Sequence, residues 1–384
     1  MNIMVSRTGS VRWPWRRLRL VPCAAGLAAA ILAVAGCSSA PGSAGAAATQ
    51  RADSASPSWH IVKRVANDSN GGFTAVTAVG QDGGWAFYAM GTVTAKPTAW
   101  ERNGLTWTQV PFPGLSEETV VAAAATSATD VWAFTSEYGK GTSRALRWNG
   151  RYWTVVRSFS RGIGGAVVLS PVDVWVFGQP YQPGADLGAW HYNGRTWSQV
   201  ASGQDLEGGS GLSASDIWAF DGADVAHWNG STWSRSSVAS LLPATQRGLN
   251  DPALAGIYEQ STHSVYAIAN GNEQASGGPL AILHWNGSAW SKVAGGGRGY
   301  GGQPSSDGHG GLWLATDTCC GGGGYVLHYS AGHLTQAAVP GGPERIQVDA
   351  VALIPGTAEL LVVGDTHPYP DENHFVGVIL LYGT

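Results

Sequence analysis

The chain has 384 residues, of which 55 are glycine and 18 are tryptophan, and only 12% are charged. This composition suits many short strands joined by tight turns, and it rules out a mainly helical fold. The formal net charge of −4 excludes the strongly basic surface that non-specific binding to nucleic acid requires.

The first 36 residues have the features of a bacterial export signal. The segment before residue 21 contains five arginines and no acidic residue. It is followed by an apolar stretch, 21–36, which is short for a membrane span. The stretch ends in Val34-Ala35-Gly36-Cys37, which resembles a lipobox, the motif whose cysteine is lipidated and becomes the new N-terminus. We therefore predict a lipoprotein signal peptide over 1–36 and a lipid anchor, such as palmitate, on Cys37. A plain secretory signal with an incidental cysteine is the alternative.

The next segment, 37–57, is predicted to be a flexible tether because Ala, Ser, Gly and Pro dominate it. A coil of about 20 residues spans ~25 Å on average. The sequence thus places the protein on the extracytoplasmic face of the cell membrane, attached through its lipid alone, or in the secreted fraction.

From residue 58 onward the chain is built from a repeat of 43 to 48 residues. One signature is Asp-apolar-Trp-apolar-apolar, as in 130–134, and its central residue recurs at positions 85, 132, 175, 218, 266, 313 and 361. The other is Trp-Asn-Gly-x-x-Trp, as in 148–153, which indicates two strands joined by a type I′ turn at Asn-Gly. In the second repeat the four predicted strands are 119–125, 131–135, 144–148 and 152–156. Four strands in such a period are typical of a propeller blade, whose fixed tryptophans we expect to pack between blades.

The two ends of the repeat region complement each other. The last repeat has predicted strands near 360–363 and 376–382 but no fourth strand, whereas 58–62 resembles an isolated fourth strand. We therefore predict an all-β fold over 58–384, a seven-bladed β-propeller of four-stranded blades closed by an N-terminal strand that completes the last blade. A two-sheet sandwich is the alternative fold, but it does not explain the period.

These two signatures resemble the repeat propellers common in secreted actinobacterial proteins, which are grouped loosely with Asp-box, kelch and galactose-oxidase-like propellers. The sixth repeat, from Asp307 to Trp313, is also similar to the sensor propellers of two-component regulators. The aspartate precedes the second strand here, whereas an Asp box lies between the third and fourth strands, and no kelch double glycine recurs. The resemblance implies the fold and leaves the function open.

Binding residues are expected in the connections between the second and third strands, which vary most from repeat to repeat. These connections are 89–97, 136–143, 179–188, 270–279, 317–324 and 365–375, and the fourth repeat has almost none after Asp221. The candidate ligand-binding residues in them are Tyr181, Cys319, Cys320, Tyr369, Asp371 and His374.

Two of these connections raise the question of a metal or a disulfide. Asp365, His367, Asp371 and His374 are plausible ligands for a divalent cation, but their spacing matches no metal motif, so no metal or cofactor is predicted. Export favours disulfides, and the adjacent Cys319 and Cys320 form either a vicinal disulfide, free thiols or a metal site.

The sequence favours a non-catalytic binding or interaction module at the cell envelope, a monomer whose partner is an unknown extracellular ligand or envelope protein. An extracellular carbohydrate-active enzyme, hydrolase or lyase, with its site at the channel mouth is one alternative. An envelope assembly factor or scaffold is the other. No catalytic residue is assigned, because no carboxylates are paired in the sequence and no nucleophile motif is present.

Overall fold

The computed structural model describes residues 57–66, 71–90, 96–137, 141–179, 187–202, 206–244, 252–271, 278–317, 323–341, 344–368 and 375–383. All of them belong to one compact unit, Ser54–Thr384. They form strands β1 to β29 and one short 3₁₀ helix, Ala239–Leu241. Among them, no helix has the length and apolar character needed to cross a membrane.

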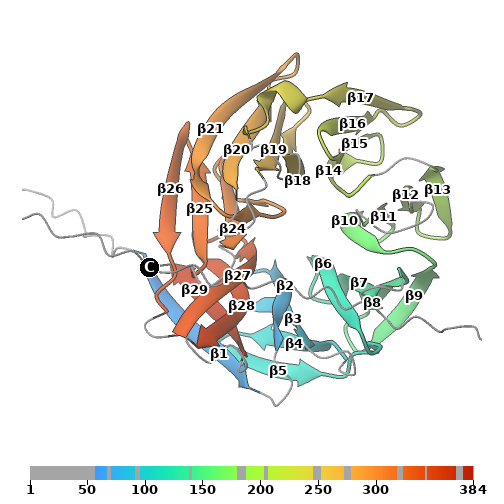
Figure 1. Ribbon diagram of the computed structural model, residues 1–384. Helices are drawn as coiled ribbons and strands as arrows, with labels where there is room; N and C mark the ends of the chain where they lie inside the picture. Colours follow the sequence, from blue (N-terminus) through green and yellow to red (C-terminus); the bar gives the residue numbers. More distant parts are fainter. Residues whose placement is uncertain are drawn as a thin grey trace, which may run out of the picture. The chain divides into compact units, whose positions relative to one another are not determined.

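The strands form seven antiparallel sheets that stand around a common axis as the blades of a propeller (Figure 1). In the first five blades the strands follow one another in sequence order from the axis outward. The first blade contains β2 (Gly71–Val79), β3 (Gly83–Met90), β4 (Thr98–Asn103) and β5 (Thr106–Val110). The second contains β6 (Glu118–Ser127), β7 (Asp130–Glu137), β8 (Ser143–Trp148) and β9 (Trp153–Phe159). The third contains β10 (Ile163–Ser170), β11 (Asp173–Gly178), β12 (Ala189–Tyr192) and β13 (Trp197–Ala201). The fourth contains β14 (Gly208–Ser213), β15 (Asp216–Asp221), β16 (Asp224–Trp228) and β17 (Trp233–Ser237). The fifth contains β18 (Ala253–Ser261), β19 (Ser264–Asn270), β20 (Pro279–Trp285) and β21 (Trp290–Arg298).

The innermost strand of the sixth blade is interrupted. Its two pieces, β22 (Tyr300–Gly301) and β23 (Ser305–Ser306), both pair with β24 (Leu312–Asp317). The blade continues outward with β25 (Tyr325–Ser330) and β26 (His333–Ala338). Residues 302–304 therefore leave the sheet and are available to line the axis.

The seventh blade closes the ring with strands from both ends of the repeat region. It contains β27 (Glu344–Leu353), β28 (Leu360–Pro368), β29 (Val376–Gly383) and, outermost, β1 (Ser58–Ala66). The pairing of β1 with β29 is antiparallel, from Ser58 opposite Gly383 to Ala66 opposite Val376. The predicted seven-bladed propeller and its closure by the N-terminal strand are confirmed.

In the second to fifth blades the Asn-Gly hairpins differ from the predicted two-residue type I′ turns, whereas in the first blade two residues, Gly104 and Leu105, join the strands. In the second blade Trp148 pairs with Trp153, so four residues connect the strands. The side-chain oxygen of Asn149 accepts hydrogen bonds from the backbone N–H groups of Arg151 and Tyr152, both at 3.0 Å, and only Gly150 has a positive φ, +87°. The asparagine thus closes the loop with its side chain rather than by adopting the left-handed conformation.

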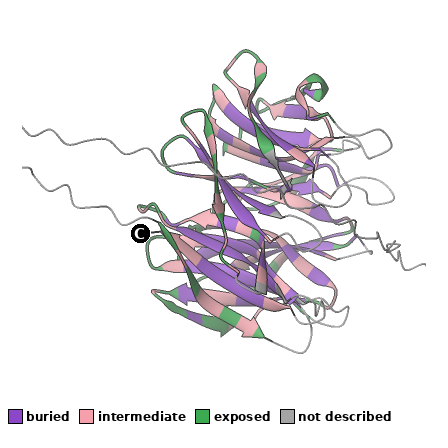
Figure 2. Cartoon of the chain, turned by 60° about the vertical axis from the view of Figure 1, so that its left-hand side comes forward, coloured by how far each residue is buried: buried purple, intermediate pink, exposed green. Residues whose placement is uncertain are grey.

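The tryptophans of the repeat fill the gaps between blades, as predicted. Trp175 is 1% exposed, and its ring centroid lies 6.0 Å from that of Trp228 and 6.4 Å from that of Trp233, both in the next blade. Equivalent groups of three tryptophans join the first blade to the second and the fourth to the fifth. Figure 2 shows the buried residues along the strands, with exposed residues gathered at their turns.

The two ends of the ring carry different connections. One end, here called the hairpin end, holds the turns between the first and second strands and the hairpins between the third and fourth strands of each blade. The opposite end, the loop end, holds the connections between the second and third strands and those that lead to the next blade. In the fourth blade only Gly222 and Ala223 join β15 to β16, which is the short connection that the sequence predicts.

Candidate functional site

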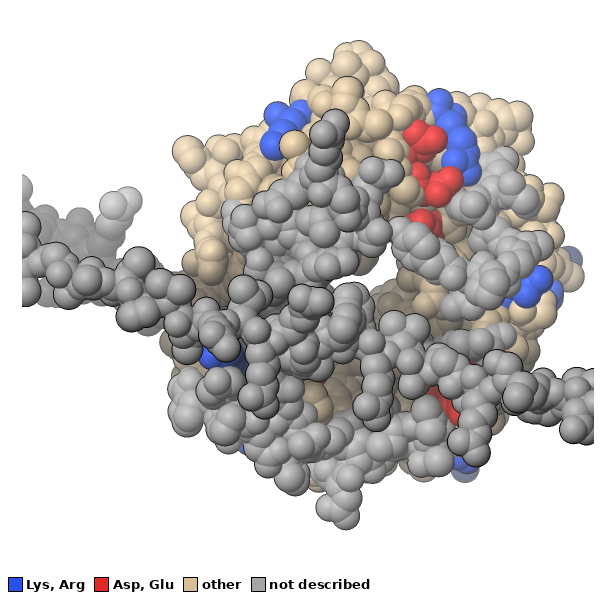
Figure 3. Space-filling model, in the orientation of Figure 1, with Lys and Arg blue, Asp and Glu red and all other residues tan. Residues whose placement is uncertain are grey.

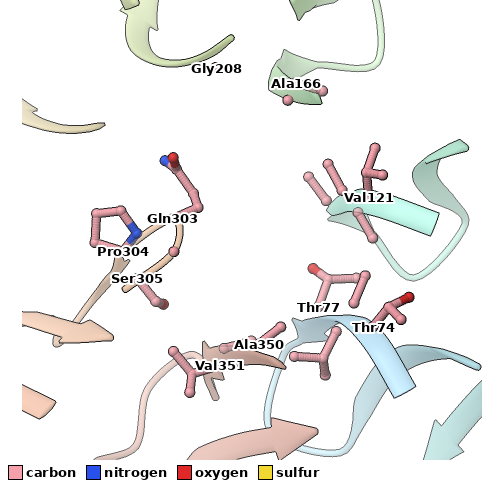
Figure 4. A pocket seen from close by; sticks show the side chains of 18 of the residues that line it. Thr74, Thr77, Val121, Ala166, Gly208, Gln303, Pro304, Ser305, Ala350 and Val351 are labelled. Carbon is pink, nitrogen blue, oxygen red and sulfur yellow. The ribbon is translucent and has the colours of Figure 1, made fainter. Parts of the chain in front are cut away.

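A channel runs along the axis of the ring and is lined by the innermost strands of all seven blades. Its volume is about 540 Å³. The wall consists mostly of glycine, alanine, threonine and valine, with β6, β10 and β14 forming an arc of small residues (Figure 4). Glycine is required in this arc, because a Cβ atom at Gly209 would lie 2.6 Å from the ring of Phe177. The small residues leave the backbone of the inner strands close to the channel.

Polar side chains join neighbouring inner strands along the wall. Thr74 donates from its hydroxyl to the carbonyl oxygen of Val120 in the next blade, at 2.9 Å. The backbone N–H of Glu259 donates to the hydroxyl of Ser210 in the preceding blade, at 2.8 Å. These bonds satisfy groups on strand edges that have no partner within their own blade.

The interrupted strand of the sixth blade gives the channel its asymmetry. The side-chain amide of Gln303 donates to the carbonyl oxygen of Ile257 at 2.6 Å, and its oxygen accepts from the N–H of the same residue at 3.4 Å. Asn270 makes a similar pair of bonds with the backbone of Gly301, at 2.8 and 3.1 Å. Figure 4 shows Gln303 and Pro304 on the side of the channel opposite Val121. Such irregular strands often mark binding sites.

The charged residues that line the channel in the described part of the chain are acidic. Glu207 directly precedes β14, and Asp349 lies at the bulge of β27. Figure 3 shows the opening of the ring, with acidic and basic side chains together over the fourth blade. Asp221 and Arg235 belong to that blade and form an ion pair at 2.9 Å. Within the described ranges, no three His, Cys, Asp or Glu side chains are arranged to hold a metal ion.

The six residues that the sequence singles out for ligand binding lie outside the described residues. Tyr181 falls between β11 and β12, Cys319 and Cys320 between β24 and β25, and Tyr369, Asp371 and His374 between β28 and β29. The flanking strands place all three connections at the loop end, where the channel opens. The predicted lipidation site, Cys37, also lies outside the described residues.

A group of residues at the hairpin end was not anticipated from the sequence. In the third blade His191 lies opposite Trp175 across β11 and β12, with their rings stacked at 4.4 Å, and its Nε2 lies 2.9 Å from Asp173. The fourth and sixth blades repeat this arrangement with His227 and His328. The signal was present, because these histidines directly precede the aromatic residue of the hairpin. Their contacts tie the second strand to the third and point to a structural role.

The electrostatics of the sixth blade follow from this arrangement. Burial by itself would raise the pKa of Asp307. The hydrogen bonds from His328 and from the backbone N–H groups of His309 and Gly311 outweigh burial, so the pKa of Asp307 is lowered from its usual value. Asp307 is thus held ionised as an acceptor in the turn that precedes the second strand of the sixth blade.

Comparisons with known proteins establish the fold alone. No family model matches the chain, and no curated protein matches its sequence significantly. Among solved structures, it is similar to YCF48 bound to D1 peptide, with 12% identity, 85% of this chain and 97% of that chain covered, and a TM-score of 0.53. It is also similar to U3-55K, with 11% identity, 83% and 98% coverage, and a TM-score of 0.54. The WD40 repeats of RRP9 match with 12% identity, 84% and 97% coverage, and a TM-score of 0.54. The chain therefore has the fold of these β-propellers.

Proposed function

We propose that the protein is a non-catalytic binding module on the extracytoplasmic face of the cell membrane, anchored through lipid on Cys37. Its ligand is an extended segment of another protein, which binds at the loop end of the ring and enters the channel. The basis for the anchor is the lipobox-like sequence that ends at Cys37. The basis for the binding site is the wall of the channel.

The channel wall is the observation that carries the ligand class. Each inner strand pairs with its own blade along one edge and presents the other edge toward the axis. The small side chains of β6, β10 and β14 leave room in the channel beside these edges. An extended peptide binds such an edge through main-chain hydrogen bonds, and side-chain pockets around it supply specificity.

Two further observations support a protein segment as the ligand. The connections between second and third strands are longer in six blades than in the fourth, where two residues join β15 to β16, so we expect a ligand to approach the channel over the fourth blade. One structural neighbour, YCF48, is described as bound to a peptide. A propeller of this shape is thus a suitable scaffold for peptide binding, although function belongs to the site and not to the fold.

The ligand class is tested with a library of displayed random peptides selected on the purified protein. We expect a selected peptide to bind the wild type and to bind Ala350→Phe at least about tenfold more weakly, a difference of about 1.4 kcal/mol, because the new ring fills the channel. Ala338→Phe is the matched control, since Ala338 is exposed on the outermost strand β26. Tyr369→Ala and Asp371→Ala are expected to weaken the same peptide. Equal affinity of all four variants, or no selected peptide at all, would contradict the proposal.

The anchor is tested separately by Cys37→Ser in the full chain. If Cys37 carries the lipid, the wild type fractionates with membranes and the variant moves to the soluble or secreted fraction. Because the substitution leaves residues 58–384 unchanged, the thermal unfolding of the propeller provides the control for folding. Membrane association of both proteins to the same extent would show that Cys37 is not the anchor.

A further inference from the structure

The predicted tether joins the propeller at one defined end. Ser58, the first residue of β1, pairs with Gly383, the last residue of β29. The third strand of every blade runs toward the hairpin end, so β29 finishes there and β1 begins there. The C mark in Figures 1 and 2 lies beside this junction. A chain anchored at Cys37 therefore reaches the ring at its hairpin end, at the rim of the seventh blade.

The same end exposes most of the large apolar side chains on the described surface. Four of these seven residues lie at the hairpin end: Leu105 (79% exposed), Tyr152 (53%) and Val172 (55%) in turns, and Leu212 (47%) near the end of β14. Only Leu115 lies at the loop end, and the other two, Ile61 and Val155, lie on the outermost strands β1 and β9. The four residues at the hairpin end come from four consecutive blades, the first to the fourth.

The acidic side chains at the hairpin end lie beside basic ones, and the exposed Asp82, in the turn between β2 and β3, lies near Arg102. Four aspartates at this end contact a basic partner in their own blade, three at the start of the second strand and Asp307 in the turn before it: Asp130 with Arg147, Asp173 with His191, Asp216 with His227 and Asp307 with His328. Arg151 and Arg195 are exposed at the tips of two hairpins, next to the apolar residues of the second and third blades. Arginine beside exposed apolar and aromatic side chains suits the phosphate and headgroup region of a bilayer.

We propose that the hairpin end of the first four blades rests on the membrane, with Leu105, Tyr152, Val172 and Leu212 entering the headgroup region. This inference rests on the lipid anchor of the proposed function. The occupant is the lipid surface itself, since about 20 residues between Cys37 and Ser58 hold the ring within ~25 Å of the bilayer on average. Docking in this orientation directs the loop end, and with it the mouth of the channel, away from the membrane toward extracellular partners.

The orientation is measured with an environment-sensitive fluorophore at two matched leucines. Leu105→Cys and Leu115→Cys are each made with Cys319→Ser and Cys320→Ser in the full chain, which is purified with its lipid and reconstituted into vesicles of phosphatidylcholine and phosphatidylglycerol. Lipids that carry a nitroxide quencher are included. We expect severalfold stronger quenching of the label at position 105 than at position 115. Tyr152→Ser combined with Val172→Ser is expected to reduce quenching at position 105, whereas Val155→Ser is not.

Flotation of the vesicles separates the two ways in which the experiment can fail. If the protein does not float with the vesicles, the anchor is absent, and both the proposed location and the docking are wrong. If it floats but the labels at 105 and 115 are quenched equally, or position 115 more strongly, the anchor stands and the docked orientation is wrong. If the label at position 105 is quenched more strongly but Tyr152→Ser combined with Val172→Ser does not reduce this quenching, docking through these side chains is likewise wrong.

Discussion

Glu259 occupies a position that small or apolar residues fill in other blades. Glu259 lies opposite the residue that directly precedes the aromatic residue of the second strand. The residues that occupy the position of Glu259 in three earlier blades are Ala125, Val168 and Gly211. Glu259 is 2% exposed, and no donor in the described residues lies in full hydrogen-bonding geometry to its carboxyl oxygens. The repeat alone gives no reason to expect an acid there, which is why the sequence did not reveal it.

The environment of Glu259 favours its neutral form. Burial is the main cause, and the negative charge of Asp216 and a hydrogen bond shared with it act in the same direction, while the N–H of Leu212 opposes them. Together they raise the pKa of Glu259 from 4.5 to about 9. Asp216 in turn lies 2.7 Å from His227, so the group spans the boundary between the fourth and fifth blades.

The raised pKa predicts that stability falls as the pH rises. The folded state retains a proton on Glu259 that the unfolded chain releases above pH 4.5. The contribution to the free energy of unfolding is therefore complete below pH 4.5 and is lost progressively as the pH rises toward about 9. Glu259→Gln keeps the neutral shape, and we expect it to be more stable than the wild type at pH 8 and nearly equal to it at pH 4.

Denaturant unfolding of both proteins across this pH range measures the difference directly. The wild-type curve is expected to approach that of Glu259→Gln as the pH is lowered. Glu101→Gln provides a comparison in which the same trend is expected, because burial alone raises the pKa of Glu101 and no second carboxylate contributes. Parallel curves for the wild type and Glu259→Gln would show that Glu259 is ionised in the folded protein.

Among the elements, those that repeat were predictable and those that depart from the repeat were not. The second blade illustrates the first case: the strand predicted over 131–135 is β7, Asp130–Glu137, and its tryptophan packs against the next blade as expected. Periodic spacing supplies this information because every blade must bury the same face against its neighbour. The sequence could not show that Asn149 would close its hairpin through the side chain, since both turn types favour Asn-Gly.

The sixth blade illustrates the second case. Its inner strand is split between Gly301 and Ser305, and Gln303 bonds to the neighbouring blade instead of its own. No pattern within the repeat foretells this, because the bond depends on how closely two blades approach. The channel wall was hidden for a related reason: small residues such as those of β10 and β14 carry no distinct signature, and their importance appears only once seven inner strands meet around one axis.

At the scale of the whole molecule, stability depends on closure of the ring. Each blade buries its two faces against its neighbours, so an open seventh blade would weaken the packing on the first as well. β1 provides the fourth strand of that blade over its full length, and the ring of Trp59 packs against that of Tyr382 with centroids 4.5 Å apart. The strand that closes the ring is also the one through which the predicted anchor is attached.

Two deletions test this closure. Removing 38–57, which the sequence predicts to be a tether, should leave the thermal midpoint nearly unchanged. Removing 38–63 also takes away Trp59 and most of β1, so β29 becomes an exposed edge and loses its outer ladder of hydrogen bonds. A loss on the order of 5 kcal/mol would lower the midpoint by about 10 °C for a domain of this size. Trp59→Ala supplies an intermediate variant that keeps the strand, in case the longer deletion prevents folding. Equal midpoints for the two deletions, with Trp59→Ala also unchanged, would mean that β1 does not stabilise the ring.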